Sequence, residues 1–195
     1  MGQFINGYLL IIPISHIMSN AELDSSLREE FLTVLDDITY ILELTYHTSN
    51  FLVWENGTGN SGIGKAKDSV VHAHTHIAPS KLSASEIETI SKFSFDKIPY
   101  EYLSLYGNHS YLLIKGIGDN WLINDNPELY IPRQYVRQLL AEEYNISGES
   151  WNWRIYPFLN SIIQTIVDIT TALNEHWDEL PERIKKNTKN FLYQK

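Results

Sequence analysis

A chain of 195 residues is long enough for one full hydrophobic core but too short for two ordinary domains. Its formal net charge of -9 argues against broad, non-specific binding to DNA or RNA, since such binding depends on lysine and arginine neutralising phosphates. The absence of cysteine excludes a disulfide scaffold, a zinc-thiolate site and thiol catalysis.

The apolar segments have the lengths of strands and amphipathic helices, because no uninterrupted run reaches the ~18 residues of a membrane span. The first run, Gly7 to Pro13, is continuous and ends in proline, which predicts a central strand covered on both faces. No basic segment precedes it and no small-residue cleavage site follows it, so it does not have the pattern of a signal peptide. We therefore expect a soluble, cytoplasmic protein without a membrane partner.

A long amphipathic helix and two strands are predicted next. Apolar residues recur at steps of three and four from about Ala21 to Tyr46, and Asn20 can cap this helix. Phe51 to Trp54 is a predicted strand, and the glycine-rich segment from Glu55 to Gly64 is a predicted loop. This loop leads into a further strand, Ser69 to Ala78, which carries three histidines.

The rest of the chain predicts two more strands and several helices. Ala84 to Lys92 has the pattern of a short helix, whereas Tyr111 to Lys115 and Trp121 to Ile123 have the pattern of two strands joined by a turn. A helical pattern begins at Pro132, with Val136, Leu139 and Leu140 on one face, and breaks at Ser147-Gly148. Two further helices are predicted from about Phe158 to Leu173 and from about Pro181 to Leu192. The organisation is therefore a mixed sheet with a long helix, followed by a helical C-terminal third.

His72, His74 and His76 alternate along their predicted strand, so they point to one face and form a row ~13 Å long. Two adjacent members could share a metal ion, whereas all three could do so only if the strand were bent. A two-histidine site would need a further ligand. The candidates for that ligand are Asp68, His16 and His109. A metal-dependent hydrolase is therefore one interpretation of these histidines.

Nucleophilic catalysis is a second interpretation. A neutral imidazole attacks phosphorus near pH 7 when its other nitrogen donates a hydrogen bond that fixes the tautomer. Neighbouring histidines would then stabilise charge on the phosphate or protonate the leaving oxygen. Backbone N–H groups of the glycine-rich loop could bind phosphate oxygens, and Lys65 and Lys67 could contact a polyphosphate tail. The third interpretation is a chance alternation of histidines on a partly exposed strand.

The segment from Val71 to Pro79 resembles the histidine triad (HIT) motif, in which mostly apolar residues separate and follow a His-x-His-x-His run. Thr75 occupies a position that is more often leucine or valine in that family. Gly7 to His16 is similar to the family's earlier strand, which ends in proline and, three residues later, a fourth histidine. Glu55-Asn56-Gly57 stands where the family has an acidic or amide residue before glycine. The resemblance covers roughly Gly7 to Ser80.

The resemblance implies a role for each matching histidine. His74, the middle one, would be the nucleophile that attacks an α-phosphate and becomes a nucleotidyl-histidine intermediate. His76 would contact the phosphate and the leaving oxygen, and His72 would position its neighbours. His16 would support the ring of the nucleophile.

The same resemblance implies binding residues outside the triad. Ser69 matches a hydroxyl that touches the phosphate region, and either Asn56 or Glu55 would fill the loop's polar role. Asp68 stands where many members have glutamine, and its charge would repel a phosphate unless it bonded a histidine or faced away. The family's strand or hairpin before the Gly7 segment has no counterpart here, so we expect the base-binding pocket to be more open or to use the C-terminal third.

The implied structure is an α+β, HIT-like fold with an antiparallel sheet, one long helix and a helical C-terminal extension. Residues 1–130 would form the HIT-like domain, and residues 131–195 would pack on the same core. The implied function is hydrolysis or transfer at the α-phosphate of a nucleoside phosphoanhydride, phosphoramidate or ester, with diadenosine and other dinucleoside polyphosphates as the first substrate class. No cofactor or protein-bound metal is required, although a divalent cation can accompany the nucleotide. A homodimer is compatible with the resemblance.

A nucleotide-binding or regulatory module that keeps this fold without turnover is the main alternative, and Asp68 favours it. Arg133 and Arg137 lie one helical turn apart, and Trp151 to Arg154 adds aromatic faces and a third guanidinium. These residues could bind phosphate and base, or the tryptophans could fill the seam between the C-terminal helices and the sheet, with the arginines at the surface. We assign them no catalytic role from the sequence.

Overall fold

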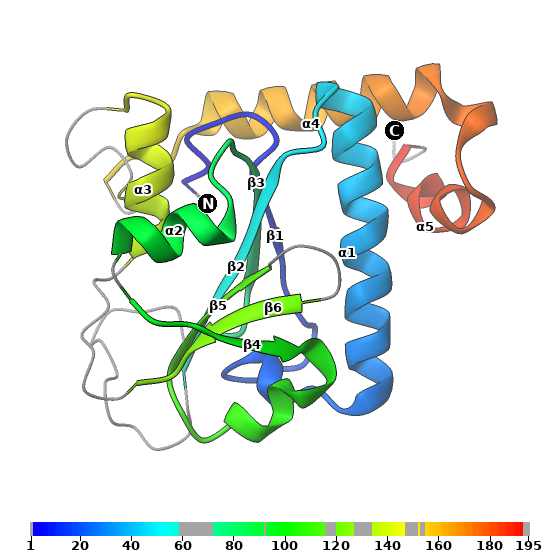
Figure 1. The fold of residues 1–195 in the computed structure, drawn as a ribbon. Coiled ribbons are helices and arrows are strands. Elements are labelled where there is room, and N and C mark those ends of the chain that lie inside the picture. The colour runs from blue at the N-terminus through cyan, green and yellow to red at the C-terminus, as the bar shows by residue number, and fades with distance from the viewer. Residues whose placement is uncertain are drawn as a thin grey trace.

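The computed structural model of the chain describes residues 2–58, 72–91, 93–115, 120–126, 134–146, 152 and 155–192. These residues form an α+β structure in which helices cover both faces of one six-stranded antiparallel sheet (Figure 1). The strand order is β1-β3-β2-β5-β6-β4. The bounds are β1 (Leu9–Ile11), β2 (Phe51–Gly57), β3 (Thr75–Pro79), β4 (Asp96–Pro99), β5 (Tyr111–Lys115) and β6 (Asn120–Asn124). The predicted α+β class with an antiparallel sheet is confirmed.

The C-terminal third is helical, as predicted, and the short helix after β3 is also present. The α-helices are α1 (Ser25–Tyr46), α2 (Ala84–Ser91), α3 (Tyr135–Glu143), α4 (Leu159–Glu175) and α5 (Glu182–Leu192). Short 3-10 segments are η1 (Asn20–Glu22), η2 (Tyr100–Tyr106) and η4 (Trp177–Glu179). β4 and η2 occupy a segment for which the sequence pattern predicts no element.

The long helix α1 begins later than predicted, because Asp24 and not Asn20 is its cap. The Asp24 carboxylate accepts a hydrogen bond from the backbone N–H of Leu27 at 2.9 Å, which satisfies one of the free donors of the first turn. Asn20 instead starts η1 and is buried, with 1% of its surface exposed. The prediction of a helix starting at Ala21 is therefore wrong by one turn, whereas its end at Tyr46 is confirmed.

Strand β1 is an edge strand of three residues and not the predicted central strand from Gly7 to Pro13. Leu9 and Ile11 pack with the cluster under α1, whereas Leu10 packs with the cluster on the other face. A continuous apolar run here therefore reflects an edge strand with both faces covered. Pro13 has no N–H with which to extend the ladder.

Strand β3 begins at Thr75, so His76 lies in the strand whereas His72 and His74 precede it. The predicted row of three histidines on one strand face is therefore wrong. Strand β2 continues through Gly57, three residues further than predicted. The extension matters because it places residues 55 and 56 on opposite faces of the sheet.

The two faces of the sheet carry different chemistry. The pairing puts Leu10, His76, Trp54 and Ile114 in one row across four strands. This row belongs to the face that packs against α2 and α3. The alternate residues face α1, where Val53 and Ile77 join its apolar side. His76 therefore points toward the helices α2 and α3 and away from α1.

The C-terminal helices are tied to the sheet and to α1. α3 contributes Val136 and Leu140 to the cluster on the face of the sheet that carries His76, called the histidine face below. The hydroxyl of Thr165 in α4 accepts from the backbone N–H of Gly7 at 3.0 Å. The predicted boundary at residue 130 lies outside the described residues.

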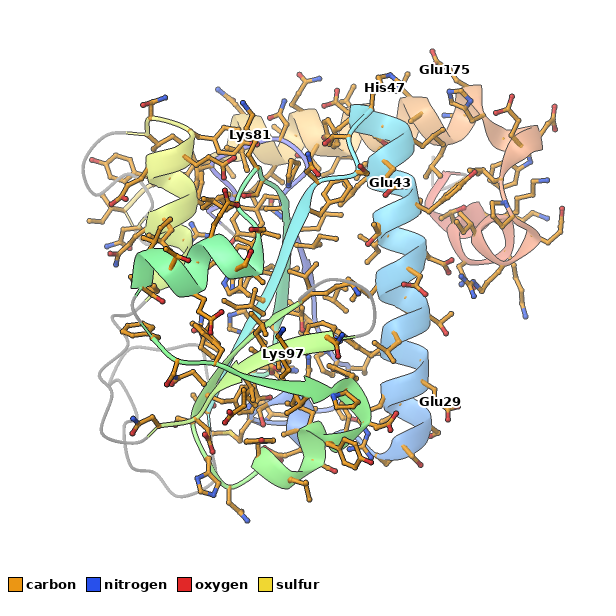
Figure 2. All side chains as sticks on the ribbon, in the orientation of Figure 1. Glu29, Glu43, His47, Lys81, Lys97 and Glu175 are labelled. Carbon is orange, nitrogen blue, oxygen red and sulfur yellow. The ribbon has the colours of Figure 1, made fainter. Side chains whose placement is uncertain are left out.

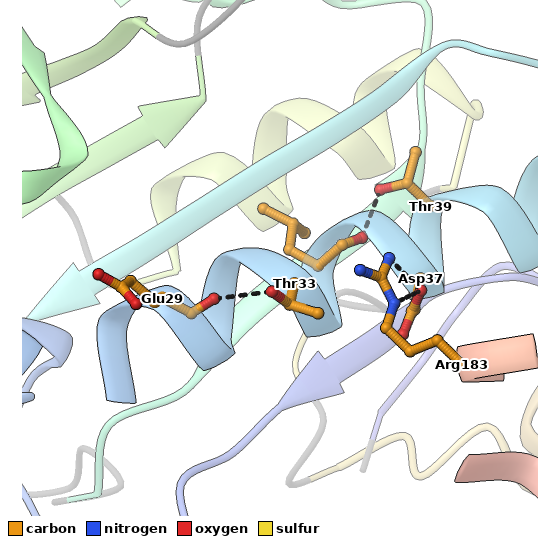
Figure 3. A network of polar contacts seen from close by, with 6 residues as sticks. Glu29, Thr33, Asp37, Thr39 and Arg183 are labelled. Atoms are coloured by element: carbon orange, nitrogen blue, oxygen red, sulfur yellow. Dashed lines mark hydrogen bonds and ion pairs between the residues drawn. The ribbon is translucent and has the colours of Figure 1, made fainter. Parts of the chain in front are cut away.

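Helix α5 is joined to α1 by an ion pair. The Arg183 guanidinium donates to the Asp37 carboxylate at 2.6 and 2.9 Å (Figure 3). The hydroxyls of Thr33 and Thr39, drawn in the same view, bond the carbonyls four residues earlier and remain within α1. The ion pair therefore links the helix that covers the sheet to the last described helix.

The outer side of α1 is polar. Glu29 lies near one end of this helix, and Glu43 and His47 lie near the other (Figure 2). His47 ends α1 in the left-handed conformation, with φ of 52°, and lines a cavity of about 240 Å³ together with Glu175 of α4. Within the described ranges, none of the helices is both long and apolar enough to cross a membrane.

We predict that Gly57→Ala destabilises the fold by about 1–3 kcal/mol, because a Cβ at this position would collide with the ring of Tyr111 on the neighbouring strand. Urea unfolding followed by circular dichroism measures the change. Gly107→Ala is the matched control, since its nearest neighbours would lie at 3.7–3.9 Å, an ordinary contact distance. Equal effects of the two substitutions would contradict this packing argument.

Candidate active site

His74 is held in the short segment that leads into β3. The backbone N–H of Ala73 donates to the carbonyl of Ile17 at 2.8 Å, which anchors this segment beside the N-terminal part of the chain. Nδ1 of His74 lies 2.8 Å from the carbonyl oxygen of His72. A carbonyl only accepts hydrogen bonds, so Nδ1 must carry the proton. In the neutral ring, Nε2 then keeps its lone pair.

The charge of His74 is set mainly by burial. Burial lowers the pKa of His74 below its ordinary value of 6.5, and the hydrogen bond to the His72 carbonyl opposes only part of that shift. The imidazole is therefore neutral near pH 7. Among the described residues, no hydrogen bond occupies its Nε2. These properties are those of a nucleophilic imidazole whose tautomer is fixed.

His76 lies deeper, with 6% of its surface exposed. Its ring stacks on the indole of Trp54, with centroids 4.6 Å apart and planes 5° from parallel. Its Nδ1 is 2.7 Å from the hydroxyl of Tyr8. Burial lowers the pKa of His76 well below 6.5, and the positive charge of Arg137 lowers it further. The rings of His76 and His74 meet edge to face at 4.8 Å.

Arg137 of α3 belongs to this site, and the surface position that the sequence left open for it is wrong. Its guanidinium is buried, donates to the Tyr8 hydroxyl at 2.8 Å and donates to the Gly2 carbonyl at 2.6 Å. It also lies over the rings of Phe4 and Tyr8, 5.0 and 5.1 Å from their centroids. The helical pattern of Val136, Leu139 and Leu140 marks the core side of α3 but does not place Arg137 at its centre, since successive residues of a helix are about 100° apart.

His72 and His16 form a second pair beside the first. Nε2 of His72 donates to the carbonyl of Pro13 at 2.9 Å, and the two imidazole rings are 5.1 Å apart. His16 is exposed. The structure therefore brings all four predicted histidines into one neighbourhood, but the described ring contact of His16 is with His72 and not with His74.

Glu55 and Asn56 lie on opposite faces of β2. Asn56 is two residues after Trp54 and shares the histidine face. Glu55 is fully buried on the α1 face, where it accepts from the backbone N–H of Asn20 and from the Tyr111 hydroxyl, each at 2.8 Å. Of the two candidates for the loop's polar role, only Asn56 is on the face that carries His76.

Several predicted residues cannot be placed. Ser69, Lys67, Asp68, Arg133 and the segment containing Trp151, Trp153 and Arg154 lie outside the described residues. His109 follows η2 in an exposed turn. In the described ranges, no group of three or more histidine, aspartate or glutamate side chains has an arrangement that could hold a metal ion.

Comparisons with known proteins assign no family to this site. A scan against models of protein families found no match, and a search of curated protein sequences found none either.

We predict that Glu55→Gln removes the pH dependence that ionisation of Glu55 gives to the free energy of unfolding. Burial raises the pKa of Glu55 from 4.5 to about 7, so between these values the folded protein keeps a proton that the unfolded chain has released. The contribution of Glu55 to the free energy of unfolding therefore falls by roughly 1–3 kcal/mol as the pH rises through that window. Glutamine keeps an acceptor for Asn20 and offers a donor to Tyr111, but it does not ionise.

Urea unfolding at pH 5 and at pH 8 tests this prediction. The wild-type protein should lose more stability between the two conditions than Glu55→Gln does. Glu29→Gln removes the same charge from the exposed side of α1 and controls for net charge. The same pH dependence in the wild-type protein and in Glu55→Gln would contradict the assignment.

Proposed function

We propose that this protein is a HIT-like enzyme that hydrolyses or transfers a nucleotidyl group, with His74 as the nucleophile. One observation carries the proposal: the His72 carbonyl holds the His74 proton on Nδ1, and burial keeps the ring neutral. Nε2 is thereby left with a lone pair. The resemblance of residues 71–79 to the histidine triad motif supports the same assignment.

The first step would form a bond between Nε2 of His74 and the α-phosphorus. The bond from phosphorus to the leaving oxygen breaks, and its electron pair departs with that oxygen. Attack through Nε2 places positive charge on the imidazole while Nδ1–H still faces the His72 carbonyl. That hydrogen bond strengthens as the donor becomes charged, so it stabilises the transition state more than the ground state.

The second step would release the nucleotide. Water, or a second acceptor hydroxyl, forms a bond to phosphorus and gives its proton to the solvent. The phosphorus–nitrogen bond breaks, and its electron pair returns to Nε2. His74 ends in its starting tautomer, because its Nδ1 proton has not moved.

Dinucleoside polyphosphates are the substrate class that we propose first. His74 and His76 provide adjacent imidazoles for a phosphate and a leaving oxygen, and Asn56 adds an uncharged polar side chain on the same face. The carboxylate of Glu55 lies on the opposite face, where it does not repel an anionic substrate. The mechanism uses no protein-bound metal, and a divalent cation would enter only with the nucleotide.

We predict a covalent adduct of one nucleoside monophosphate on the wild-type protein and none on His74→Ala. Intact-mass spectrometry detects it in samples quenched in mild alkali within milliseconds to seconds of mixing with diadenosine polyphosphates, nucleoside phosphoramidates or a nucleotide-sugar. Turnover of His74→Ala should fall at least about 10³-fold, as expected for loss of a nucleophile. His109→Ala, in an exposed turn, is the matched control.

The same experiment separates the alternatives. Adduct formation should survive a chelator, whereas a metal-dependent hydrolase would lose its activity. Wild-type turnover by His74→Ala would contradict the proposal. Tight nucleotide binding without adduct or product would favour the regulatory module.

We further predict that the acidic limb of kcat/KM lies below pH 6.5. Because burial lowers the pKa of His74, the ring stays neutral and nucleophilic to a lower pH than an exposed histidine does. The substrate for this measurement should carry only internal phosphates, as diadenosine polyphosphates do, so that no terminal phosphate ionises in the same range. An acidic limb at or above pH 6.5 would contradict the burial argument.

A further inference from the structure

Arg137 is a buried cation to which the proposed reaction assigns no role. Its side chain is 4% exposed and lies on α3, in the C-terminal third of the chain. A guanidinium only donates hydrogen bonds, so the Tyr8 oxygen must be the acceptor of the 2.8 Å bond between them. The Tyr8 proton must then point elsewhere, and Nδ1 of His76 lies 2.7 Å away.

The direction of this chain of bonds fixes the proton of His76. A neutral imidazole has one N–H, and its other nitrogen accepts. If Nδ1 accepts from Tyr8, the proton of His76 is on Nε2. His74 is held in the opposite tautomer, because its Nδ1 donates to the His72 carbonyl. His74 then offers a lone pair at its Nε2, and the neighbouring His76 offers an N–H at its own Nε2.

We propose that Arg137, acting through Tyr8, is a positioning residue that locks His76 as an Nε2–H donor for the leaving oxygen. This inference rests on the proposed nucleotidyl chemistry of His74. Arg137 reaches no reacting atom itself. It orients the Tyr8 hydroxyl, and the hydroxyl orients the proton of His76.

The chain of bonds would orient a proton and not conduct one. Burial raises the pKa of Tyr8 to about 12, even though the Arg137 charge acts in the other direction. Tyr8 therefore keeps its proton, and His76 stabilises the leaving oxygen by a hydrogen bond without protonating it. The electron pair of the broken bond stays on that oxygen, which takes its proton from the solvent. The Arg137 charge also disfavours a second proton on His76, which keeps Nδ1 an acceptor.

A purely structural role is the competing explanation. Arg137 also binds the Gly2 carbonyl and packs on Phe4, so it fastens the N-terminal segment to α3. Loss of that fastening would lower stability, but it would not select one tautomer of His76. The experiment must therefore read out the position of the proton.

Tyr8→Phe removes the hydroxyl that links Arg137 to His76 but keeps the aromatic ring and its packing. Long-range ¹H–¹⁵N correlation spectra locate the proton of His76. In the wild-type protein it should reside on Nε2. In Tyr8→Phe and in Arg137→Met, a second population with the proton on Nδ1 should appear. Tyr144→Phe is the matched control, since that hydroxyl donates to the Pro79 carbonyl and does not touch His76. Unchanged His76 spectra in Tyr8→Phe would overturn the inference.

A kinetic readout uses aryl esters of adenosine 5′-monophosphate with leaving groups of graded acidity. Tyr8→Phe should lower kcat roughly 10- to 100-fold for the most basic leaving groups and much less for 4-nitrophenolate, with KM little changed. An equal loss for every leaving group would overturn the inference and leave His74 chemistry intact. If the wild-type protein cleaves neither these esters nor a diadenosine polyphosphate, the proposed function fails, and the spectra alone then decide whether Arg137 and Tyr8 lock the tautomer.

Discussion

The site depends on hydrogen bonds whose direction cannot be reversed. The His72 carbonyl accepts from Nδ1 of His74 and cannot donate, and the Arg137 guanidinium donates to Tyr8 and cannot accept. His76 is buried and His74 is partly buried, and this burial favours the neutral form of both rings, which makes the position of a single proton on each ring decisive. The tautomers of the two rings therefore follow from the His72 carbonyl and the Arg137 guanidinium, whose hydrogen-bonding roles are fixed.

The alternation of the antiparallel sheet separates this site from a second buried polar cluster. His76 and Trp54 face α2 and α3, whereas Glu55 and Thr75 face α1. On that second face, Asn20 donates through its backbone to Glu55 and through its side-chain amide to the Thr75 hydroxyl. Glu55, an acid whose pKa is raised to about 7, thus lies on the face of the sheet opposite to His76. The same two strands hold both clusters in register.

Sequence patterns predicted the elements whose periodicity is long and regular. The apolar repeat predicted α1 and its end at Tyr46. Its start was misplaced because Asn20 is held by Glu55 and Thr75, contacts made 35 and 55 residues away. The edge position of β1 could not be inferred, since an apolar run has the same pattern in a central strand and in an edge strand covered on both faces. Arg137 was beyond the pattern for a similar reason: its bond to Tyr8 spans 129 residues.

The central claim is that His74 presents an unprotonated Nε2 near neutral pH, and neutron diffraction from crystals of the deuterated protein tests it most directly. The account predicts a deuteron on Nδ1 of His74, directed at the His72 carbonyl, and none on Nε2. A deuteron on Nε2, alone or together with one on Nδ1, would show that His74 lacks the lone pair that nucleophilic attack requires, and it would contradict the account.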